Sequence, residues 1–167
     1  MARVAKQRGW GQAVAHSVRT AVVAVVSLLV ARMFRLPESY WAPVTTLVIT
    51  QSSLGAALKV SWQRFLGTAL GAVVGGVAAS AFGPHLGPHL VVVLGVSVLL
   101  LGLVCAAVGA DWSAYRFGGV ALAIVVLVPW AEQAWLVAFH RFAEVSIGIG
   151  VALGFAIVWP EQDSAGR

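Results

Sequence analysis

The chain has 167 residues, of which 60% are hydrophobic and only 10% are charged. Soluble domains carry about 45–50% apolar and about 25% charged residues, and a domain of this size cannot hide such an excess from water, so a water-soluble fold is excluded. The formal net charge is +5, but the positive charges are scattered between apolar runs, which argues against a nucleic-acid partner and for a lipid bilayer as the solvent.

Six apolar segments follow one another along the chain, cut at charged, Gly-Pro and Trp-rich boundaries. In chain order they cover about 18–36, 41–58, 65–82, 90–110, 117–130 and 142–159. A helix needs about 20 residues to cross about 30 Å of hydrocarbon, so the second and fifth segments are weak spans that need neighbouring helices around them. The sequence predicts an all-α membrane protein, a six-transmembrane helical bundle over residues 18–160, between a basic N-terminal segment (1–17) and a C-terminal tail (161–167).

Tryptophan and basic residues indicate where these segments end and how they are oriented. Every tryptophan falls at a predicted segment end, where an indole is half buried in the membrane interface: Trp10, Trp41, Trp62, Trp112, Trp130, Trp135 and Trp159. With six crossings and a cytoplasmic N-terminus, only Arg32, Arg35 and Arg141 lie on the outer side, and the other basic residues are cytoplasmic. This distribution follows the positive-inside rule, so both termini are predicted to be cytoplasmic.

The two halves of the chain resemble each other. Gln63-Arg64-Phe65 opens the third segment and His140-Arg141-Phe142 opens the sixth, and at the same offset Gly71 matches Gly148. Further matches are Val74 with Val151, Ala79 with Ala156 and, at nearly this offset, Tyr40 with Tyr115. Three spans per half is an odd number, so the second copy is expected to be inverted, a recurring transporter design with the site at the repeat interface. The alternative is that apolar, Gly-rich sequences align with themselves by chance.

The second segment carries hydroxyl and amide groups at membrane depth. Thr46, Thr50, Gln51 and Ser52 are candidates for a substrate pathway, and Pro43 is expected to leave a helical carbonyl free. Irregular backbone at this depth persists only where protein or a water-filled cavity covers it. A permeating carboxylate would find donors here; hydrogen bonding between helices, without a ligand, is the alternative.

Four arginines, Arg19, Arg64, Arg116 and Arg141, lie at or just inside segment ends. Such arginines commonly extend to the interface with their stems along lipid. Alternatively, they line a vestibule and attract anions, because a guanidinium matches a carboxylate in a two-pronged geometry. Glu144 follows Arg141 on one helical face and is expected to form a local ion pair, with proton coupling as the alternative. No carboxylate is expected in the middle of a span.

Glycines recur at four-residue spacing in two segments. Gly67, Gly71 and Gly75 form one such stripe on the third segment, and Gly150 and Gly154 form another on the sixth. Residues without side chains let helix backbones approach closely in lipid. They are predicted to be helix-packing positions, and the sequence leaves open whether the partner helix belongs to this chain or to a second copy.

No catalytic, metal-binding or cofactor-binding motif is recognisable. His85 and His89 have the spacing of a helical metal pair, but the Gly-Pro pairs around them predict a loop. The Gly-rich stretches lack the Lys-Ser/Thr of a phosphate-binding loop, and no nucleophile has an evident base. Neither enzymatic activity nor a metal or cofactor is expected.

Several blocks carry a family resemblance over about residues 19–160: Arg19-Thr20 through Ala31, Tyr40-Trp41-Ala42-Pro43, Thr50-Gln51-Ser52-Ser53-Leu54-Gly55, Gln63-Arg64-Phe65-Leu66-Gly67-Thr68, Tyr115-Arg116-Phe117-Gly118-Gly119, His140-Arg141-Phe142 and Trp159-Pro160. The chain resembles the membrane domain of the fusaric acid resistance-like family, related to bacterial aromatic acid exporters. The early blocks are the more specific ones.

This resemblance implies inner-membrane efflux of small aromatic acids or related toxic compounds by a bundle with about six spans per half. Plant malate channels are distant relatives, so an anion channel is a second possibility, and a non-transporting scaffold or accessory subunit is a third. Many family members carry two membrane halves and large cytoplasmic domains, whereas this chain stops shortly after Pro160. The expectation is a half-size unit that binds a small organic anion and works as a homodimer or larger homo-oligomer.

Overall fold

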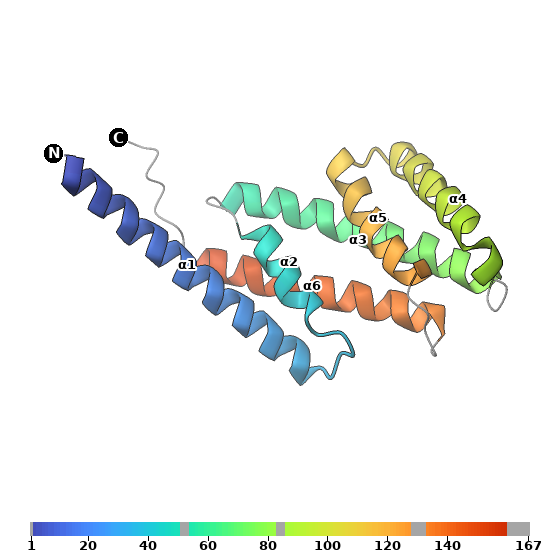
Figure 1. The fold of residues 1–167 in the computed structure, drawn as a ribbon, viewed down its shortest axis with the longest axis horizontal. Coiled ribbons are helices and arrows are strands. Elements are labelled where there is room, and N and C mark those ends of the chain that lie inside the picture. Colours follow the sequence, from blue (N-terminus) through green and yellow to red (C-terminus); the bar gives the residue numbers. More distant parts are fainter. Residues whose placement is uncertain (1, 51–53, 83–85, 128–132, 160–167) are drawn as a thin grey trace.

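The computed structural model describes residues 2–50, 54–82, 86–127 and 133–159, which form six helices (Figure 1). In chain order these are α1 (Ala2–Met33), α2 (Trp41–Ile49), α3 (Leu54–Phe82), α4 (Leu86–Ala107), α5 (Trp112–Leu127) and α6 (Ala134–Val158). Four of them are long and apolar enough to cross a membrane: α1 over Ala13–Met33, α3, α4 over His89–Ala107, and α6. The predicted all-helical membrane bundle is thereby confirmed.

The second and fifth helices are short, as predicted. α5 has 16 residues and α2 has 9, which correspond to lengths of about 24 Å and about 14 Å. Because α2 cannot reach across the hydrocarbon by itself, its ends must be covered by other parts of the protein. Contacts with α1 on one side and α6 on the other supply this cover.

Three helices begin well before the apolar segments that predicted them. α3 starts at Leu54 and α6 at Ala134, while α1 already starts at Ala2. Hydropathy marks the part of a helix that meets lipid, whereas the backbone hydrogen bonds of a helix continue through polar residues such as Lys59. Residues 54–58 therefore belong to α3 and not to the second segment, and Trp62 lies within α3 rather than at its end.

α4 also begins earlier than predicted, and it includes His89. The predicted loop around the two histidines is therefore wrong at His89. Pro88 falls in the first turn of α4, where a missing backbone N–H breaks no helical hydrogen bond. His85 lies outside the described residues.

The two halves of the bundle are inverted copies of one arrangement. Figure 1 shows α3 and α6 side by side in the middle of the molecule, running in opposite directions. α1 and α4 also run in opposite directions on opposite sides of this pair, and so do α2 and α5. In this symmetry α1 corresponds to α4, α2 to α5 and α3 to α6. The contacts agree with it: the contact of α3 with α5 corresponds to that of α6 with α2, and the contact of α1 with α2 corresponds to that of α4 with α5.

Individual residues follow the same symmetry. The Phe65 and Phe142 rings, from the two matching Arg-Phe motifs, meet with centroids 5.0 Å apart, as residues beside a two-fold axis must. A Cβ on Gly71 would overlap the Gly118 carbonyl oxygen, and a Cβ on the matching Gly148 would lie 2.5 Å from the Ala42 carbonyl oxygen. These paired contacts confirm the inverted 3+3 repeat and rule out a chance alignment.

The ends of α1 and α4 are built alike. At each end one residue adopts a left-handed backbone, Arg35 with φ 53° and Gly109 with φ 67°. The next N–H then bonds back into the last turn, from Leu36 to the Ala31 carbonyl at 3.5 Å and from Ala110 to the Cys105 carbonyl at 2.8 Å. This is the usual way to satisfy the last carbonyls of a helix, and here it turns the chain into the short helix that follows.

The two predicted glycine stripes have different surroundings. Gly67, Gly71 and Gly75 of α3 lie against α5, where a Cβ on Gly67 or Gly71 would overlap backbone atoms. Nothing lies within 4 Å of a Cβ built on Gly150 or Gly154. Gly150 and Gly154 lie on the exposed face of α6, so no described helix is their packing partner, and packing against a second copy stays a prediction.

Candidate functional site

Arg64 and Arg141 lie where α3 and α6 meet, next to the Phe65–Phe142 contact. Only 8% of Arg64 and 3% of Arg141 is exposed, so neither side chain extends along an exposed helix surface, as the interface alternative required. Sites at the interface of inverted transporter repeats lie near the bilayer midplane, so this is the depth that we expect for the two guanidinium groups. Ionisable groups at this depth are costly and mark functional sites.

Two carboxylates converge on Arg141. Its Nη2 forms an ion pair with Glu38 Oε2, and its Nη1 lies 3.3 Å from Glu144 Oε2. Glu144 Oε1 accepts the Glu38 backbone N–H at 3.2 Å, and Glu38 Oε2 also accepts the Trp41 indole N–H at 3.1 Å. The guanidinium stacks over the Trp41 ring, 4.5 Å from its centroid. We name Glu38, Trp41, Arg141 and Glu144 the acidic cluster.

Arg64 has a different environment. Its Nε and Nη2 donate to Thr45 Oγ1 at 3.2 and 3.0 Å, and its guanidinium carbon lies 5.0 Å from the centroid of the Phe117 ring. In the part of the chain that the structure describes, no carboxylate lies within ion-pair distance of Arg64. A neutral hydroxyl and an aromatic face stabilise this cation, but they do not neutralise its charge.

The two arginines face one small cavity. It is lined by both guanidinium-bearing side chains, by Trp41 and Phe117, and by Thr68 among other residues, and its volume is about 20 Å³. This volume admits about one water molecule. The structure therefore holds the centre closed, with two cations and two aromatic rings gathered around a space that is too small for an organic ligand.

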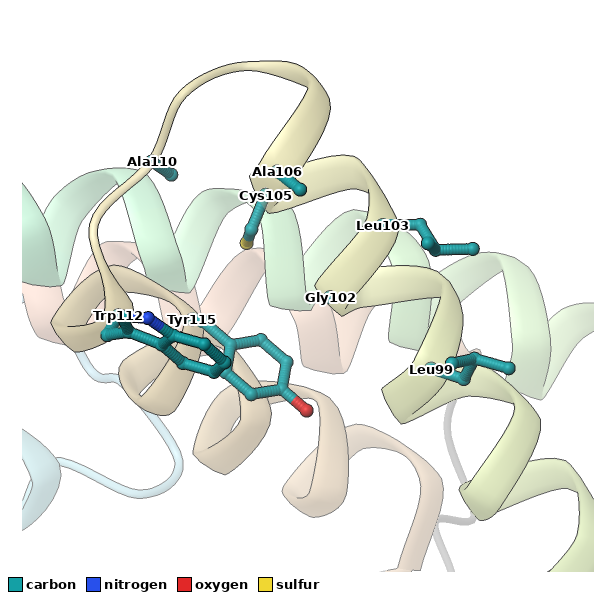
Figure 2. Close-up of a pocket in the computed structure, with 8 residues that line it drawn as sticks. All are labelled: Leu99, Gly102, Leu103, Cys105, Ala106, Ala110, Trp112 and Tyr115. Atoms are coloured by element: carbon teal, nitrogen blue, oxygen red, sulfur yellow. The ribbon is translucent and has the colours of Figure 1, made fainter.

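A larger pocket lies at the other side of α5. Figure 2 shows Trp112 and Tyr115 of α5 facing Leu99, Gly102 and Cys105 of α4 across it, and its volume is about 350 Å³. None of the described residues that line it is charged. Because polar or charged groups must orient a charged ligand, this apolar pocket between lipid-facing helices does not qualify as the anion site, despite its size.

The threonine candidates of α2 are used for backbone contacts. The Thr46 hydroxyl lies 3.0 Å from the Ala42 carbonyl oxygen and 3.1 Å from the Gly148 carbonyl oxygen, and Thr50 Oγ1 donates to the Thr46 carbonyl at 2.8 Å. The Thr46 hydroxyl thus bonds between helices, which is the alternative that the sequence left open, whereas the Thr50 hydroxyl bonds back to the backbone of α2. Gln51 and Ser52 lie outside the described residues.

Pro43 does not release a carbonyl as predicted, because it sits in the first turn of α2, where its missing N–H breaks no helical hydrogen bond. α2 ends at Ile49, and the next residue, Thr50, has an extended backbone with a ψ of 103°.

The remaining two arginine candidates lie apart from the centre. Arg19 is buried and lines a small pocket with Ile49 and Thr50 at the C-terminal end of α2, where a cation interacts favourably with the helix dipole. Arg116 is exposed on α5. The structure therefore brings together only Arg64 and Arg141 of the four.

Sequence reasoning missed the groups that surround these two arginines. α6 starts at Ala134, so the fully buried Glu144 lies well inside this helix and not near its start, and the expectation that no carboxylate lies in the middle of a span is wrong. Its predicted pairing with Arg141 is present, but Glu38, from the connection before α2, shares the same guanidinium. Trp41 and Phe117 each stack on one of the two arginines, but the repeat offset of Tyr40 and Tyr115 pairs Trp41 with Arg116, so no signal in the sequence pointed to this pair of rings.

Replacing Arg141 with methionine is expected to destabilise the protein by about 3–5 kcal/mol, because Glu38 and the buried Glu144 then lose their shared cation. Thermal unfolding of the purified protein in detergent measures the loss. Arg116→Met removes an exposed arginine and is expected to change stability by no more than about 0.5 kcal/mol. Equal melting temperatures for the two variants would contradict the structural role of Arg141.

The comparison with protein families decides the identity of the bundle. The model of the family described as fusaric acid resistance protein-like matches residues 10–155. The chain belongs to this family. The fusaric acid resistance protein-like family is one of membrane transport and resistance rather than of enzymes, which agrees with the inverted repeat and the buried arginines. No curated protein and no solved structure matches the chain.

Proposed function

We propose that this member of the fusaric acid resistance protein-like family transports small organic anions, with aromatic carboxylates as the ligand class and efflux as the direction. The observation that carries the proposal is Arg64, a buried arginine with no carboxylate partner among the described residues. A buried cation without a counter-charge is costly, so a carboxylate that reaches Arg64 is stabilised by a charge that is already in place. The Phe117 and Trp41 rings offer apolar contact to an aromatic ligand.

Transport requires the centre to open, because the cavity holds about one water molecule. The inverted repeat supplies a way to open it, since one half can rock against the other around a fixed site. Glycine contacts between α3 and α5 permit such movement without moving bulky side chains past one another. The closed centre also argues against a permanently open anion channel.

Uptake of radiolabelled benzoate into proteoliposomes, at a pH where benzoate is ionised, tests the proposal. The expected result is an initial rate well above that of protein-free liposomes, with unlabelled benzoate as a competitor and benzyl alcohol as a neutral analogue that does not compete. The proposal would be contradicted if no aromatic carboxylate tested is taken up faster than by protein-free liposomes. A stable complex with a larger transporter would then favour the accessory-subunit alternative.

We further propose a location in the cell inner membrane with both termini in the cytoplasm. Arg64 and Arg141 are buried, so they are not counted among the basic residues that flank the membrane spans. The predicted cytoplasmic side still keeps the larger number of the remaining basic residues, against Arg32 and Arg35 outside. Labelling of tags at the two ends in intact cells tests this orientation, and reaction of either tag with an impermeant reagent would contradict it.

The bundle is proposed to work as a homodimer. Gly150 and Gly154 leave a smooth, exposed strip on α6 that no other described helix covers, and such strips allow close contact between helices in lipid. Gly150→Leu is expected to convert the dimer into a monomer. The melting temperature is not expected to fall, because the new side chain contacts no other part of the same protomer. Light scattering in detergent measures the mass, and a variant that stays dimeric would remove α6 as the interface.

A further inference from the structure

We propose that Glu144 is a proton-binding site linked to the anion site at Arg64, so that binding of one anion is accompanied by uptake of one proton from water. This inference rests on the proposed function, since it requires that an anion binds at Arg64.

Glu144 is placed to hold a proton within the acidic cluster. It is fully buried, and its Oε1 is occupied by the Glu38 backbone N–H at 3.2 Å. Its Oε2 lies 3.3 Å from Arg141 Nη1, yet neither of these two buried atoms has a hydrogen-bond partner among the described residues. Glu38, in contrast, pairs directly with Arg141 and accepts the Trp41 N–H. The oxygen that is open to protonation is therefore Glu144 Oε2.

The charges of the centre are balanced only while the anion site is empty. Arg64 and Arg141 contribute two positive charges, and Glu38 and Glu144 contribute two negative ones. Both carboxylates, however, lie on the Arg141 side, which leaves Arg64 free to attract an anion. A bound monovalent anion gives the centre one net negative charge in a low-dielectric interior, where an uncompensated charge is strongly unfavourable.

Protonation of Glu144 Oε2 restores neutrality. The anion then neutralises Arg64, Glu38 neutralises Arg141, and Glu144 becomes a neutral carboxylic acid. No bond other than the O–H bond forms, and the proton comes from bulk water. The linkage acts in both directions, so a lower pH favours anion binding and a bound anion favours the proton.

Charged and titratable groups around Glu144 come from three places. Arg141 lies on α6 itself, Glu38 lies in the connection between α1 and α2, and Arg64 of α3 faces the shared cavity. His140 precedes Arg141 and is partly exposed, with its ring 6.4 Å from that of Phe139. Because His140 lies next to Arg141 in the sequence but does not belong to the acidic cluster, it serves as the matched control.

Isothermal titration calorimetry of the purified protein with benzoate tests the inference. Binding heats in buffers of different protonation enthalpy give the number of protons taken up. The wild-type protein is expected to take up close to one proton per benzoate, and its affinity is expected to fall by up to about tenfold per pH unit as the pH rises. Glu144→Gln is expected to bind benzoate without proton uptake at every pH, and His140→Gln is expected to behave as wild type.

The possible outcomes separate this inference from the proposed function. Benzoate binding without proton uptake by the wild type, full proton uptake by Glu144→Gln, or loss of uptake in His140→Gln would each overturn the proton site while leaving the anion site intact. Absence of benzoate binding by all variants would overturn the proposed function itself. If Glu144→Gln does not fold, Glu38→Gln provides the second test. With either carboxylate removed, the two arginines are balanced by the remaining carboxylate and the bound anion, so no proton is expected to be taken up.

Discussion

Replacing Arg64 with glutamine is expected to reduce benzoate uptake to the rate of protein-free liposomes and to weaken benzoate binding by at least about tenfold. Hydrogen bonds to charged groups are worth about 1.5–3 kcal/mol, and Arg64, unlike Arg141, has no carboxylate partner among the described residues. The loss of binding affinity is expected to exceed that of one hydrogen bond. Without Arg64, the positive charge of Arg141 is outnumbered by the negative charges of Glu38 and Glu144, and the net negative charge repels the anion. Proteoliposome uptake and calorimetry measure the two effects.

The conservative variant and a charge control sharpen this test. Arg64→Lys keeps the charge but loses the planar fork that contacts Thr45 through two nitrogens, so intermediate binding is expected. Lys59→Gln removes an exposed charge from the same helix and is expected to leave uptake unchanged. Wild-type uptake by Arg64→Gln, or an equal loss in Lys59→Gln, would show that Arg64 is not the anion site.

Replacing Gly71 with alanine is expected to cause a large loss of stability for the addition of one methyl group. The new Cβ would overlap the Gly118 carbonyl oxygen, and because backbone cannot rotate away as a side chain can, α3 and α5 must separate. Overpacking costs about 1–3 kcal/mol, which outweighs the gain of about 1 kcal/mol in helix propensity. Because α5 also carries Phe117, which stacks on Arg64, benzoate uptake is expected to fall as well.

Thermal unfolding in detergent distinguishes this effect from a general effect of glycine substitution. Gly95→Ala is the matched control, because a Cβ there meets nothing within 4 Å, and it is expected to leave the melting temperature unchanged or to raise it. Gly148→Ala, at the matching place in the other half, is expected to lower the melting temperature as Gly71→Ala does. Equal melting temperatures for Gly71→Ala and Gly95→Ala would mean that α3 and α5 do not pack as closely as described.

The acidic cluster illustrates why the site was harder to predict than the bundle. Glu38 and Glu144 are far apart in the sequence, and Glu38 lies in a polar connection that hydropathy assigns to the membrane surface. Only the return of α2 against α6 brings the Glu38 backbone within 3.2 Å of Glu144. Conversely, Thr46 and Thr50 looked like pathway donors because their hydroxyls are polar at membrane depth, and the helix backbones take up both hydroxyls.

The sequence by itself determined that the chain is a membrane protein with six helical segments, of which the second and fifth are short, and it predicted that the two halves are inverted copies. These properties follow from composition and from residues read along a single helix, because lipid selects for apolar side chains segment by segment. The tertiary structure alone decided which charges are buried together. Arg64 and Arg141 come from different halves, and their depth and their unequal share of carboxylates arise only where α3 and α6 cross, since contacts between distant segments leave no local pattern in the chain.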